Sequence, residues 1–359
     1  MATVTVAVPG RSYPVLVGHG ALQELGRLAK GTGASVAAVV TDATVAGLWG
    51  EPVLAGLSGA GLRAELLAVE PGERSKSLST LERVLCFLED MTLDRRDLVV
   101  ALGGGTVGDL AGFAAAVWLR GVRCVQVPTT LLAMVDSSVG GKTGVNTART
   151  KNAVGSITQP VAVLADLAVL STLPEAEYLA AFGEVAKYAV AMDRALADRL
   201  RADRAELLAR SPTALEWVVG RCVELKGRVV ATDEADAGPR AILNYGHTVG
   251  HALESASGYA AAHGRAVAFG MEAAARIAQR LRLCPAGLVA EQAGLLAEFG
   301  LPGPLPPVGA EDVLTAVGRD KKSRGGRVRW VLPRELGRAQ TGVAVPDEVV
   351  ADVVRSLLP

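Results

Sequence analysis

Two patterns of hydrophobic and polar residues divide this chain. In roughly the first 165 residues, short β-branched or apolar runs alternate with segments in which apolar residues recur at helical spacing. Strands separated by helical segments predict an α/β layer with a mostly parallel sheet. From about Pro174 onward, alanine, leucine, arginine and glutamate recur at helical spacing. We therefore predict an α/β domain over residues 1–170 and an all-α domain over residues 171–359.

The same patterns predict individual elements. The predicted strands of the first half are Val15–Gly18, Val36–Val40, Leu98–Leu102 and Val122–Val127, and its predicted helices are Ala21–Lys30 and Leu78–Asp90. The predicted helices of the second half are Glu175–Arg210, Thr213–Ala231, Thr248–Ser257 and Ala266–Arg282. The proline-rich stretch Phe299–Pro307 is predicted to be a stiff connector.

Composition narrows the class of protein. The 37 basic and 37 acidic residues cancel, which removes the overall electrostatic case for a nucleic-acid or anionic-membrane partner. The longest apolar stretches end well short of the ~20 residues that a membrane span needs, and the N-terminus has no signal-peptide pattern. The 4 cysteines form no paired motif, which is typical of reduced thiols. We expect a cytoplasmic protein with no nucleic-acid partner and no membrane.

A glycine-rich segment follows the predicted strand at Leu98–Leu102. Residues 103–108 match G-x-G-x-x-G between a strand and a helix, a geometry in which main-chain N–H groups can approach a pyrophosphate. The acidic residue that the usual dinucleotide fingerprint places ~20 residues later is missing. We therefore predict a nucleotide site other than the standard one, and a tight turn that needs glycine is the alternative.

A second polar, glycine-rich stretch spans residues 136–146. Its Gly-Gly-Lys-Thr sequence is similar to the end of a P-loop, but Asp136 and Ser137 stand where the first glycine belongs, which excludes that motif. Lys151 and Asn152 follow, and both can hydrogen-bond hydroxyls or phosphate oxygens. A loop of this length in a compact domain is more often functional than merely solvated.

Three of the 4 histidines, His247, His251 and His263, fall within seventeen residues, which favours a metal or proton-transfer site. His247 and His251 stand at i, i+4 and could face one metal, but a threonine replaces the glutamate of a zinc-protease motif. Glu184 and Lys187 share one face of an apolar helical segment, as a surface ion pair or as ligand and acid–base groups. Spacing alone therefore selects His247 and His251, with Glu184 or His263 as the third ligand.

Taken together, these segments resemble the 3-dehydroquinate synthases, a family of sugar-phosphate cyclases, over roughly residues 10–335. The resemblance implies an enzyme that uses NAD and Zn²⁺ or Co²⁺, with an N-terminal nucleotide domain and a C-terminal helical domain that holds metal and substrate. The implied reaction converts 3-deoxy-D-arabino-heptulosonate 7-phosphate into 3-dehydroquinate and phosphate, by transient oxidation, phosphate elimination, reduction and aldol closure. A homodimer is also implied, in which Arg120 reaches the active site of the partner subunit.

The resemblance also implies roles for individual residues. It implies metal ligation by Glu184, His247 and His263, not by the i, i+4 pair that spacing selects. The implied nucleotide site consists of Asp42, Glu73, Lys76, Gly104, Gly105, Thr106, Val107, Gly108, Asp109, Thr129, Thr130, Lys142 and Lys151. The implied substrate site consists of Arg120, Asp136, Lys142, Asn152, Lys187, Lys226, Arg240, Asn244, His251 and one or both of Lys321 and Lys322, with His251 facing the substrate phosphate.

The chain departs from the family pattern at a few positions. These are Thr150, Ser156, Ile157, Ala189 and Arg265. An amino-dehydroquinate synthase or another cyclase of secondary metabolism is therefore the alternative. Arg240 suits bidentate pairing with a substrate carboxylate, which sedoheptulose 7-phosphate lacks. A metal-dependent polyol dehydrogenase and a non-catalytic binding protein are more remote, because the lysines that suit a phosphorylated substrate and the metal-ligand candidates are all present.

Overall fold

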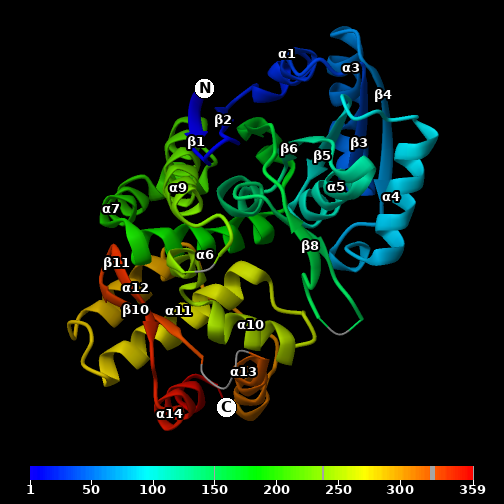
Figure 1. Ribbon diagram of the computed structural model, residues 1–359. Helices are drawn as coiled ribbons and strands as arrows, with labels where there is room; N and C mark the ends of the chain where they lie inside the picture. Colours follow the sequence, from blue (N-terminus) through cyan, green and yellow to red (C-terminus); the bar gives the residue numbers. More distant parts are fainter. Residues whose placement is uncertain (149, 237, 324–327, 359) are drawn as a thin grey trace. The chain divides into compact units, whose positions relative to one another are not determined.

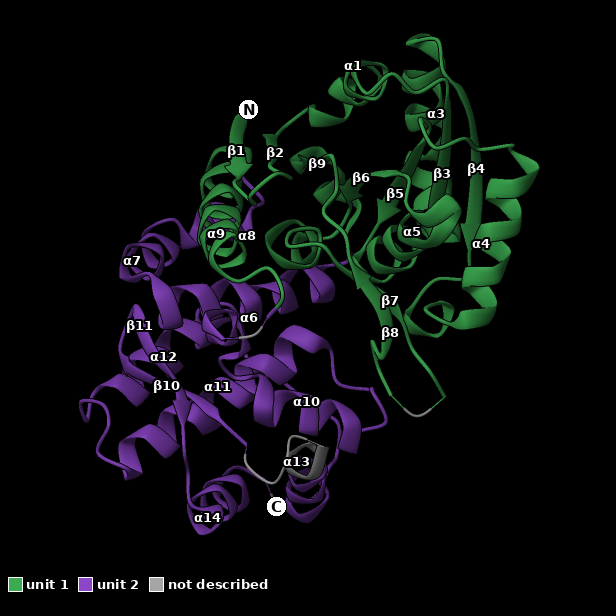
Figure 2. Ribbon diagram, viewed as in Figure 1, with its two compact units in different colours: residues 1–173, 212–235 green, residues 174–211, 236–359 purple. Residues whose placement is uncertain are grey.

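The computed structural model describes residues 1–148, 150–236, 238–323 and 328–358, without the side chains of residues 320–323. The chain divides into two compact units (Figures 1 and 2). Unit 1 comprises Met1–Leu173 and Pro212–Ala235, and unit 2 comprises Pro174–Ser211 and Asp236–Pro359. The chain therefore enters unit 2, returns to unit 1 and enters unit 2 again.

Unit 1 is built on a 7-stranded sheet with the strand order β1-β2-β9-β6-β5-β3-β4. Its strands are β1 (Ala2–Val6), β2 (Tyr13–Gly18), β3 (Val36–Asp42), β4 (Arg63–Val69), β5 (Leu98–Gly103), β6 (Arg123–Pro128) and β9 (Ala162–Asp166). β1 pairs antiparallel with β2, and all other neighbouring pairs are parallel. The predicted mostly parallel sheet is confirmed. A separate antiparallel pair is formed by β7 (Lys142–Val145) and β8 (Val154–Ile157).

Helices cover both faces of this sheet, and the central strands alternate between two hydrophobic cores. Val99 and Ala101 of β5 pack in the core that includes α4 and α5, whereas Val100 and Leu102 pack in the core that includes α1 and α3. A strand buried on both faces reads as an unbroken apolar run, which explains the sequence of β5. The helices of unit 1 are α1 (Leu25–Gly31), α2 (Ala43–Val45), α3 (Glu51–Gly59), α4 (Leu78–Asp90), α5 (Gly105–Val117) and α9 (Pro212–Thr232).

The long helix α9 belongs to unit 1, although its helical texture places it in the predicted domain of residues 171–359. It packs against the sheet edge formed by β1 and β2. The N-terminal ammonium of Met1 lies 3.3 Å from a carboxylate oxygen of Glu216, and Gly227 approaches Val6 of β1. The apolar side of α9 thus covers strands that lie some two hundred residues earlier in the sequence, a contact that helical periodicity cannot reveal.

Unit 2 is mainly helical, as predicted, and also contains a β-hairpin that is not among the predicted elements. Its helices are α6 (Glu175–Met192), α7 (Arg194–Ala202), α8 (Arg204–Leu208), α10 (His247–Ala256), α11 (His263–Arg280), α12 (Leu288–Ala297), α13 (Ala310–Ser323) and α14 (Asp347–Leu357). The antiparallel hairpin joins β10 (Trp330–Glu335) and β11 (Arg338–Val343). The predicted helix Glu175–Arg210 is interrupted at Asp193, whose carboxylate caps α7 by accepting a hydrogen bond from the N–H of Ala195.

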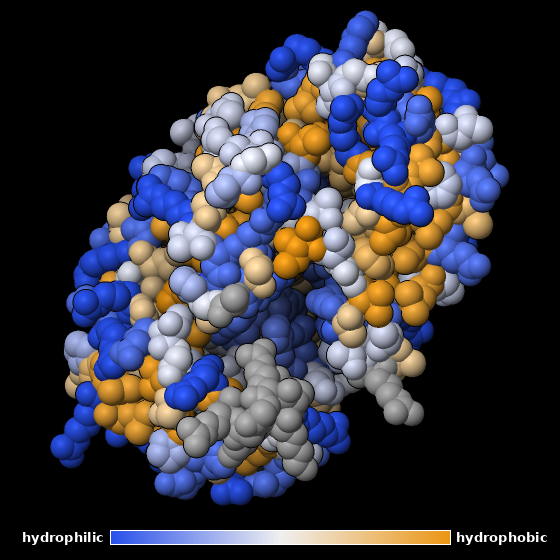
Figure 3. All heavy atoms as spheres, in the orientation of Figure 1, coloured by the Kyte–Doolittle hydropathy of each residue, from blue (hydrophilic) through white to orange (hydrophobic). Residues whose placement is uncertain are grey.

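The surface mixes hydrophilic and hydrophobic side chains over the face drawn in Figure 3. Among the described residues, no helix combines the length and the apolar character that crossing a bilayer requires.

Candidate active site

The predicted nucleotide residues of unit 1 gather at the carboxyl ends of neighbouring parallel strands. Asp42 ends β3, the segment from Gly104 follows β5, and Thr129 follows β6. The register pairs β5 with both β3 and β6, so these three positions share one edge of the sheet, the edge formed by the carboxyl ends of its parallel strands. Ligands of open α/β sheets bind outside this edge.

The glycine-rich turn between β5 and α5 is set by close packing. Glycines 103, 104, 105 and 108 are absent from the residues with positive φ, so they are not explained by a left-handed turn. A Cβ on Gly104 would lie 3.1 Å from Thr130, and one on Gly105 would lie 2.8 Å from the Ser137 hydroxyl. No side chain caps α5, so the N–H groups of its first turn remain available to a phosphate. The turn therefore fits a nucleotide.

Glu73 connects three segments near this turn. One carboxylate oxygen accepts a hydrogen bond from the Thr106 hydroxyl at 3.2 Å. The other accepts one from the Asn146 side chain at 2.8 Å and lies 4.0 Å from the ammonium of Lys151. Glu73 thus links the N-terminus of α5 to the loop that joins β7 and β8.

Lys76 forms a second connection, and it is only 4% exposed. Its ammonium donates to the carboxylate of Asp109 on α5 and to the side-chain carbonyl of Asn152 in the β7–β8 loop. Burial raises the pKa of Asp109, and the charge of Lys76 opposes that rise. The structure therefore brings together Lys76, Asp109 and Asn152, which the sequence assigns to nucleotide and substrate.

Two further lysines of unit 1 differ in their surroundings. Lys226 of α9 is 6% exposed, and its ammonium lies 2.6 Å from a carboxylate oxygen of Asp136 and donates to the Asp136 carbonyl at 2.8 Å. Lys142 opens β7 and is exposed to solvent. Arg120 lies elsewhere: α5 runs from the nucleotide edge of the sheet to the opposite edge, and Arg120 follows its far end with a positive φ of 67°.

In unit 2, glycines allow three helices to approach one another at main-chain distance. A Cβ on Gly183 of α6 would lie 2.0 Å from the carbonyl oxygen of Gly264 at the start of α11. A Cβ on Gly264 would lie 1.8 Å from the carbonyl oxygen of Ala180, and one on Gly270 would lie 1.8 Å from that of Gly246, which precedes α10. Three of these glycines are sequence neighbours of the metal-ligand candidates, which this packing draws together.

The three ligand candidates converge from these three helices. Glu184 of α6 has no exposed surface, and its Oε1 lies 3.4 Å from Nε2 of His247 and 3.4 Å from Nε2 of His263. All three donor atoms lie within 4.8 Å of one another. Two ligands on one tetrahedral Zn²⁺ are about 3.4 Å apart, since each lies about 2.1 Å from the ion. A carboxylate and two imidazoles at these separations fit a metal centre.

Both imidazoles are held at their other nitrogen. Nδ1 of His247 lies 3.1 Å from the main-chain carbonyl of Tyr245, and Nδ1 of His263 lies 3.4 Å from a carboxylate oxygen of Glu254. Donation from Nδ1 leaves Nε2 as an electron-pair donor. Glu254 is not among the predicted site residues, although its i, i+7 spacing from His247 puts it on the same face of α10.

The two histidines differ in their electrostatic surroundings. Burial lowers the pKa of His247 to about 3, against the opposing charge of Glu184. Burial also lowers the pKa of His263, but hydrogen bonding to Glu184 and Glu254 outweighs it and raises the pKa to about 10.

The other predicted residues of unit 2 differ in their placement and exposure. Lys187 is 2% exposed and its ammonium pairs with the Glu184 carboxylate. Arg240 is 3% exposed, and Asn244 lies at the end of the same 3₁₀ turn, Pro239–Asn244. His251 is exposed and is not in the Glu184 group found among the described residues, although spacing selects it. The side chains of Lys321 and Lys322 lie outside the described residues.

One family departure has a visible role. Arg265, in the first turn of α11, donates to the main-chain carbonyl of Pro302 at 2.9 Å. It ties the start of α11 to the proline-rich connector. Nothing in the structure explains the departures at Ile157 and Ala189.

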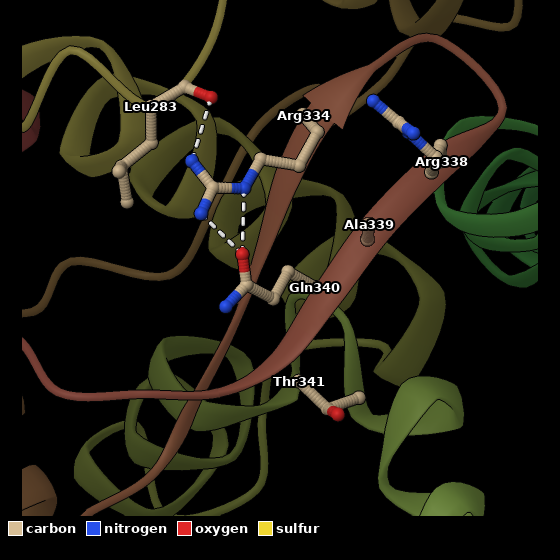
Figure 4. A pocket seen from close by; sticks show the side chains of 6 residues that line it. All are labelled: Leu283, Arg334, Arg338, Ala339, Gln340 and Thr341. Atoms are coloured by element: carbon tan, nitrogen blue, oxygen red, sulfur yellow. Dashed lines mark hydrogen bonds between the residues drawn. The ribbon is translucent and has the colours of Figure 1, made fainter.

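A separate hollow of about 680 Å³ lies beside the hairpin of unit 2 (Figure 4). Arg334 spans it, with its guanidinium donating to the carbonyl of Leu283 at 3.0 Å and to the side-chain carbonyl of Gln340. These bonds join β10 to β11 and to the turn after α11. The polar residues that line this hollow therefore hold the hairpin together.

Comparisons with known proteins place both units in one family. A family profile described as 3-dehydroquinate synthase N-terminal matches residues 66–180, and one described as 3-dehydroquinate synthase C-terminal matches residues 181–323. A protein of Pelobacter propionicus named 3-dehydroquinate synthase is 46% identical over 340 residues, 94% of each chain.

Solved structures agree over almost the whole chain. A 2-deoxy-scyllo-inosose synthase complexed with carbaglucose-6-phosphate, NAD⁺ and Co²⁺ has a TM-score of 0.92 at 27% identity and covers 99% of both chains. A 2-epi-5-epi-valiolone synthase from Streptomyces hygroscopicus with NAD⁺ and Zn²⁺ bound has a TM-score of 0.88 at 27% identity and covers 98% of both chains.

Proposed function

The chain belongs to the 3-dehydroquinate synthase family, and on this premise we propose how its residues perform the reaction. It is an NAD- and metal-dependent carbon–oxygen lyase of the shikimate pathway. It converts 3-deoxy-D-arabino-heptulosonate 7-phosphate into 3-dehydroquinate and phosphate. The observation that carries the proposal is the convergence of the buried Glu184 carboxylate with two imidazole nitrogens at 3.4 Å.

Glu184, His247 and His263 are the proposed ligands of Zn²⁺ or Co²⁺. The bound metal would polarise substrate oxygens as a Lewis acid, and bound NAD would oxidise and later reduce one substrate carbon. Lys187 supports this centre from within the protein, because its ammonium offsets the charge of the fully buried Glu184.

We assign NAD binding to the part of unit 1 that lies within residues 1–170, the proposed nucleotide-binding domain. The uncapped first turn of α5, residues 105–107, would bind the pyrophosphate through main-chain N–H groups. Glu73 and Lys76 hold this turn and the β7–β8 loop in fixed relation, so both positions contribute to the shape of the nucleotide site. Asp42, Thr129 and Thr130 complete the same sheet edge.

We assign recognition of the substrate to the polar side chains of the implied substrate site. Buried Arg240 offers a planar guanidinium for bidentate pairing with the substrate carboxylate. His251 and the lysines supply cationic or hydrogen-bonding groups for the phosphate. A carboxylate-binding arginine favours 3-deoxy-D-arabino-heptulosonate 7-phosphate over sedoheptulose 7-phosphate, and it does not separate the amino analogue.

We further propose a cytoplasmic homodimer. Arg120 lies at the sheet edge opposite the nucleotide site of its own subunit, which supports its assignment to the site of a partner subunit. None of the 4 cysteines, all of them described, is in a disulfide, as suits a reducing compartment.

The test is phosphate release from 3-deoxy-D-arabino-heptulosonate 7-phosphate by the purified protein with catalytic NAD⁺ and Zn²⁺. Nicotinamide absorbance is followed in the same cuvette. Phosphate release without lasting NADH is expected, because the hydride returns to the substrate. Accumulating NADH would instead indicate net oxidation by a dehydrogenase, and silence in both signals with turnover of the amino analogue would move the assignment to that substrate.

The variant Arg240→Ala tests the choice of substrate. Loss of a charge-assisted hydrogen bond costs about 1.5–3 kcal/mol, so kcat/KM should fall roughly 10- to 100-fold, chiefly through KM. Arg280→Ala is the matched control, because that guanidinium lies 2.9 Å from Asp352 at the surface of unit 2. An unchanged KM in Arg240→Ala would remove the argument for a carboxylate substrate.

A further inference from the structure

Glu254 lies beside the metal-ligand group without belonging to it. It is on α10, two turns after His247, and it is 5% exposed. Its Oε1 lies 3.4 Å from Nδ1 of His263, whose Nε2 faces Glu184 on the opposite side of the ring. The His263 ring therefore lies between two carboxylates, one of them a proposed metal ligand.

The position of Glu254 has a physical consequence for the His263 ring. A carboxylate buried in protein costs several kcal/mol unless it accepts hydrogen bonds or pairs with charge. The His263 ring contributes to this compensation, because its Nδ1 lies 3.4 Å from the Glu254 carboxylate. When Nδ1 donates to Glu254, loss of the second ring proton leaves the lone pair on Nε2, which is the atom aimed at the metal position.

We propose that Glu254 is a positioning residue of the metal centre, which fixes the tautomer and orientation of His263 and raises the electron density of its Nε2. This inference rests on the proposed metal role of Glu184, His247 and His263. It assigns to Glu254 no contact with the metal or substrate.

The two histidine ligands are thereby held in different ways. Nδ1 of His247 is held by the main-chain carbonyl of Tyr245, which no side-chain substitution removes. Nδ1 of His263 is held by a side chain that comes from the neighbouring helix. Mutation can therefore remove the Glu254 carboxylate while the three ligand residues are left unchanged. Through the ring of His263, Glu254 also couples α10 to α11.

A second metal ion is the competing interpretation of the same contacts. Donor atoms of His251, Glu254 and His263 also lie within 4.8 Å of one another. A metal there would require Nδ1 of His263 as a ligand, which would prevent donation to Glu254. The proposal therefore requires one metal ion per chain.

The experiment measures Zn²⁺ affinity of the metal-free protein by competition with a chromophoric chelator, together with metal content per chain. Loss of such a partner typically weakens metal binding 10- to 100-fold, which is the expectation for Glu254→Ala. Glu254→Gln retains an acceptor oxygen without the charge and should lose less. Glu272→Gln is the control, since that α11 carboxylate pairs with Arg276 and should leave affinity unchanged.

Several outcomes separate the possibilities. The absorption spectrum of the Co²⁺ protein should change in Glu254→Ala, because the field of one nitrogen ligand changes, and the unfolding temperature of the metal-free variant reports any general damage. Folded Glu254 variants with wild-type affinity and spectrum would overturn the inference, as would two metal ions per wild-type chain. Failure of the wild-type protein to bind metal would instead overturn the proposed metal centre.

Discussion

Gly264→Ala should disturb the metal centre without touching any ligand atom. The new Cβ would lie 1.8 Å from the carbonyl oxygen of Ala180 and 2.7 Å from its carbonyl carbon. An ordinary contact begins near 3.4 Å, so α11 would have to move away from α6 by about 1.6 Å. Because both contact atoms are main chain, rotation of a side chain cannot relieve the clash.

The size of this shift sets the expected effects. Overpacking of this kind typically costs 1–3 kcal/mol, so the variant should fold with lowered stability. The displacement also moves His263, the neighbour of Gly264, away from Glu184 by a similar amount. A misplacement of ~1 Å can lower a rate about 100-fold, and we expect loss of Zn²⁺ affinity and of kcat to at least that extent.

The assay combines chelator competition with urea unfolding of the metal-free protein. Gly294→Ala is the matched control, because that exposed glycine of α12 has no atom within 4 Å of the added Cβ. It should be neutral or stabilise by about 0.4–1 kcal/mol. Wild-type zinc affinity in Gly264→Ala would refute the argument that glycine contacts bring the ligands together.

Two further predictions concern the interior of each unit. Tyr245→Phe removes the hydroxyl that donates to the buried Gln292 side chain at 2.5 Å. The free energy of unfolding, measured in urea, should fall by about 1–3 kcal/mol. An unchanged value would contradict a structural role for this hydrogen bond. At pH 8, a chromogenic disulfide should label exposed Cys86 in the native protein but Cys124 only after unfolding. The reason is that burial raises the pKa of Cys124 to about 12, which leaves almost no thiolate. Equal labelling rates would show that Cys124 is accessible.

The elements that the sequence predicts best are those buried on both faces. β3 and β5 contain unbroken apolar runs, β6 has Arg123 and Gln126 among its apolar residues, and all three lie within two residues of their predicted bounds. β1 and β4 are missed because they are the two edges of the sheet, and their alternating exposed and half-buried residues carry no such run. Burial alone does not decide which strands are recognised, because β9 lies inside the sheet, is buried along its whole length and is also missed.

For the candidate site too, some residues could be recognised from the sequence and others only from the structure. Periodicity within one helix pairs His247 with His251, since only residues of the same helix enter that argument. The structure joins His247 instead to residues of α6 and α11, and the contacts that do so are made by glycines whose role depends on the facing helix. Glu254 could be read from its spacing on α10, but only the ring of His263 shows what it faces.

The path of the chain through the two units has a consequence for synthesis on the ribosome. Domains of a nascent chain usually fold in order of emergence, at about 5–20 residues per second. Here unit 1 cannot be completed until Pro212–Ala235 has emerged, and by then α6 has already appeared with Glu184 and Lys187. These charged side chains must remain hydrated until α10 and α11 are made. A nascent chain stalled after α6 and before α11 would expose α6 without the helices that cover Glu184 and Lys187. The risk of misfolding is therefore greatest in the middle of translation.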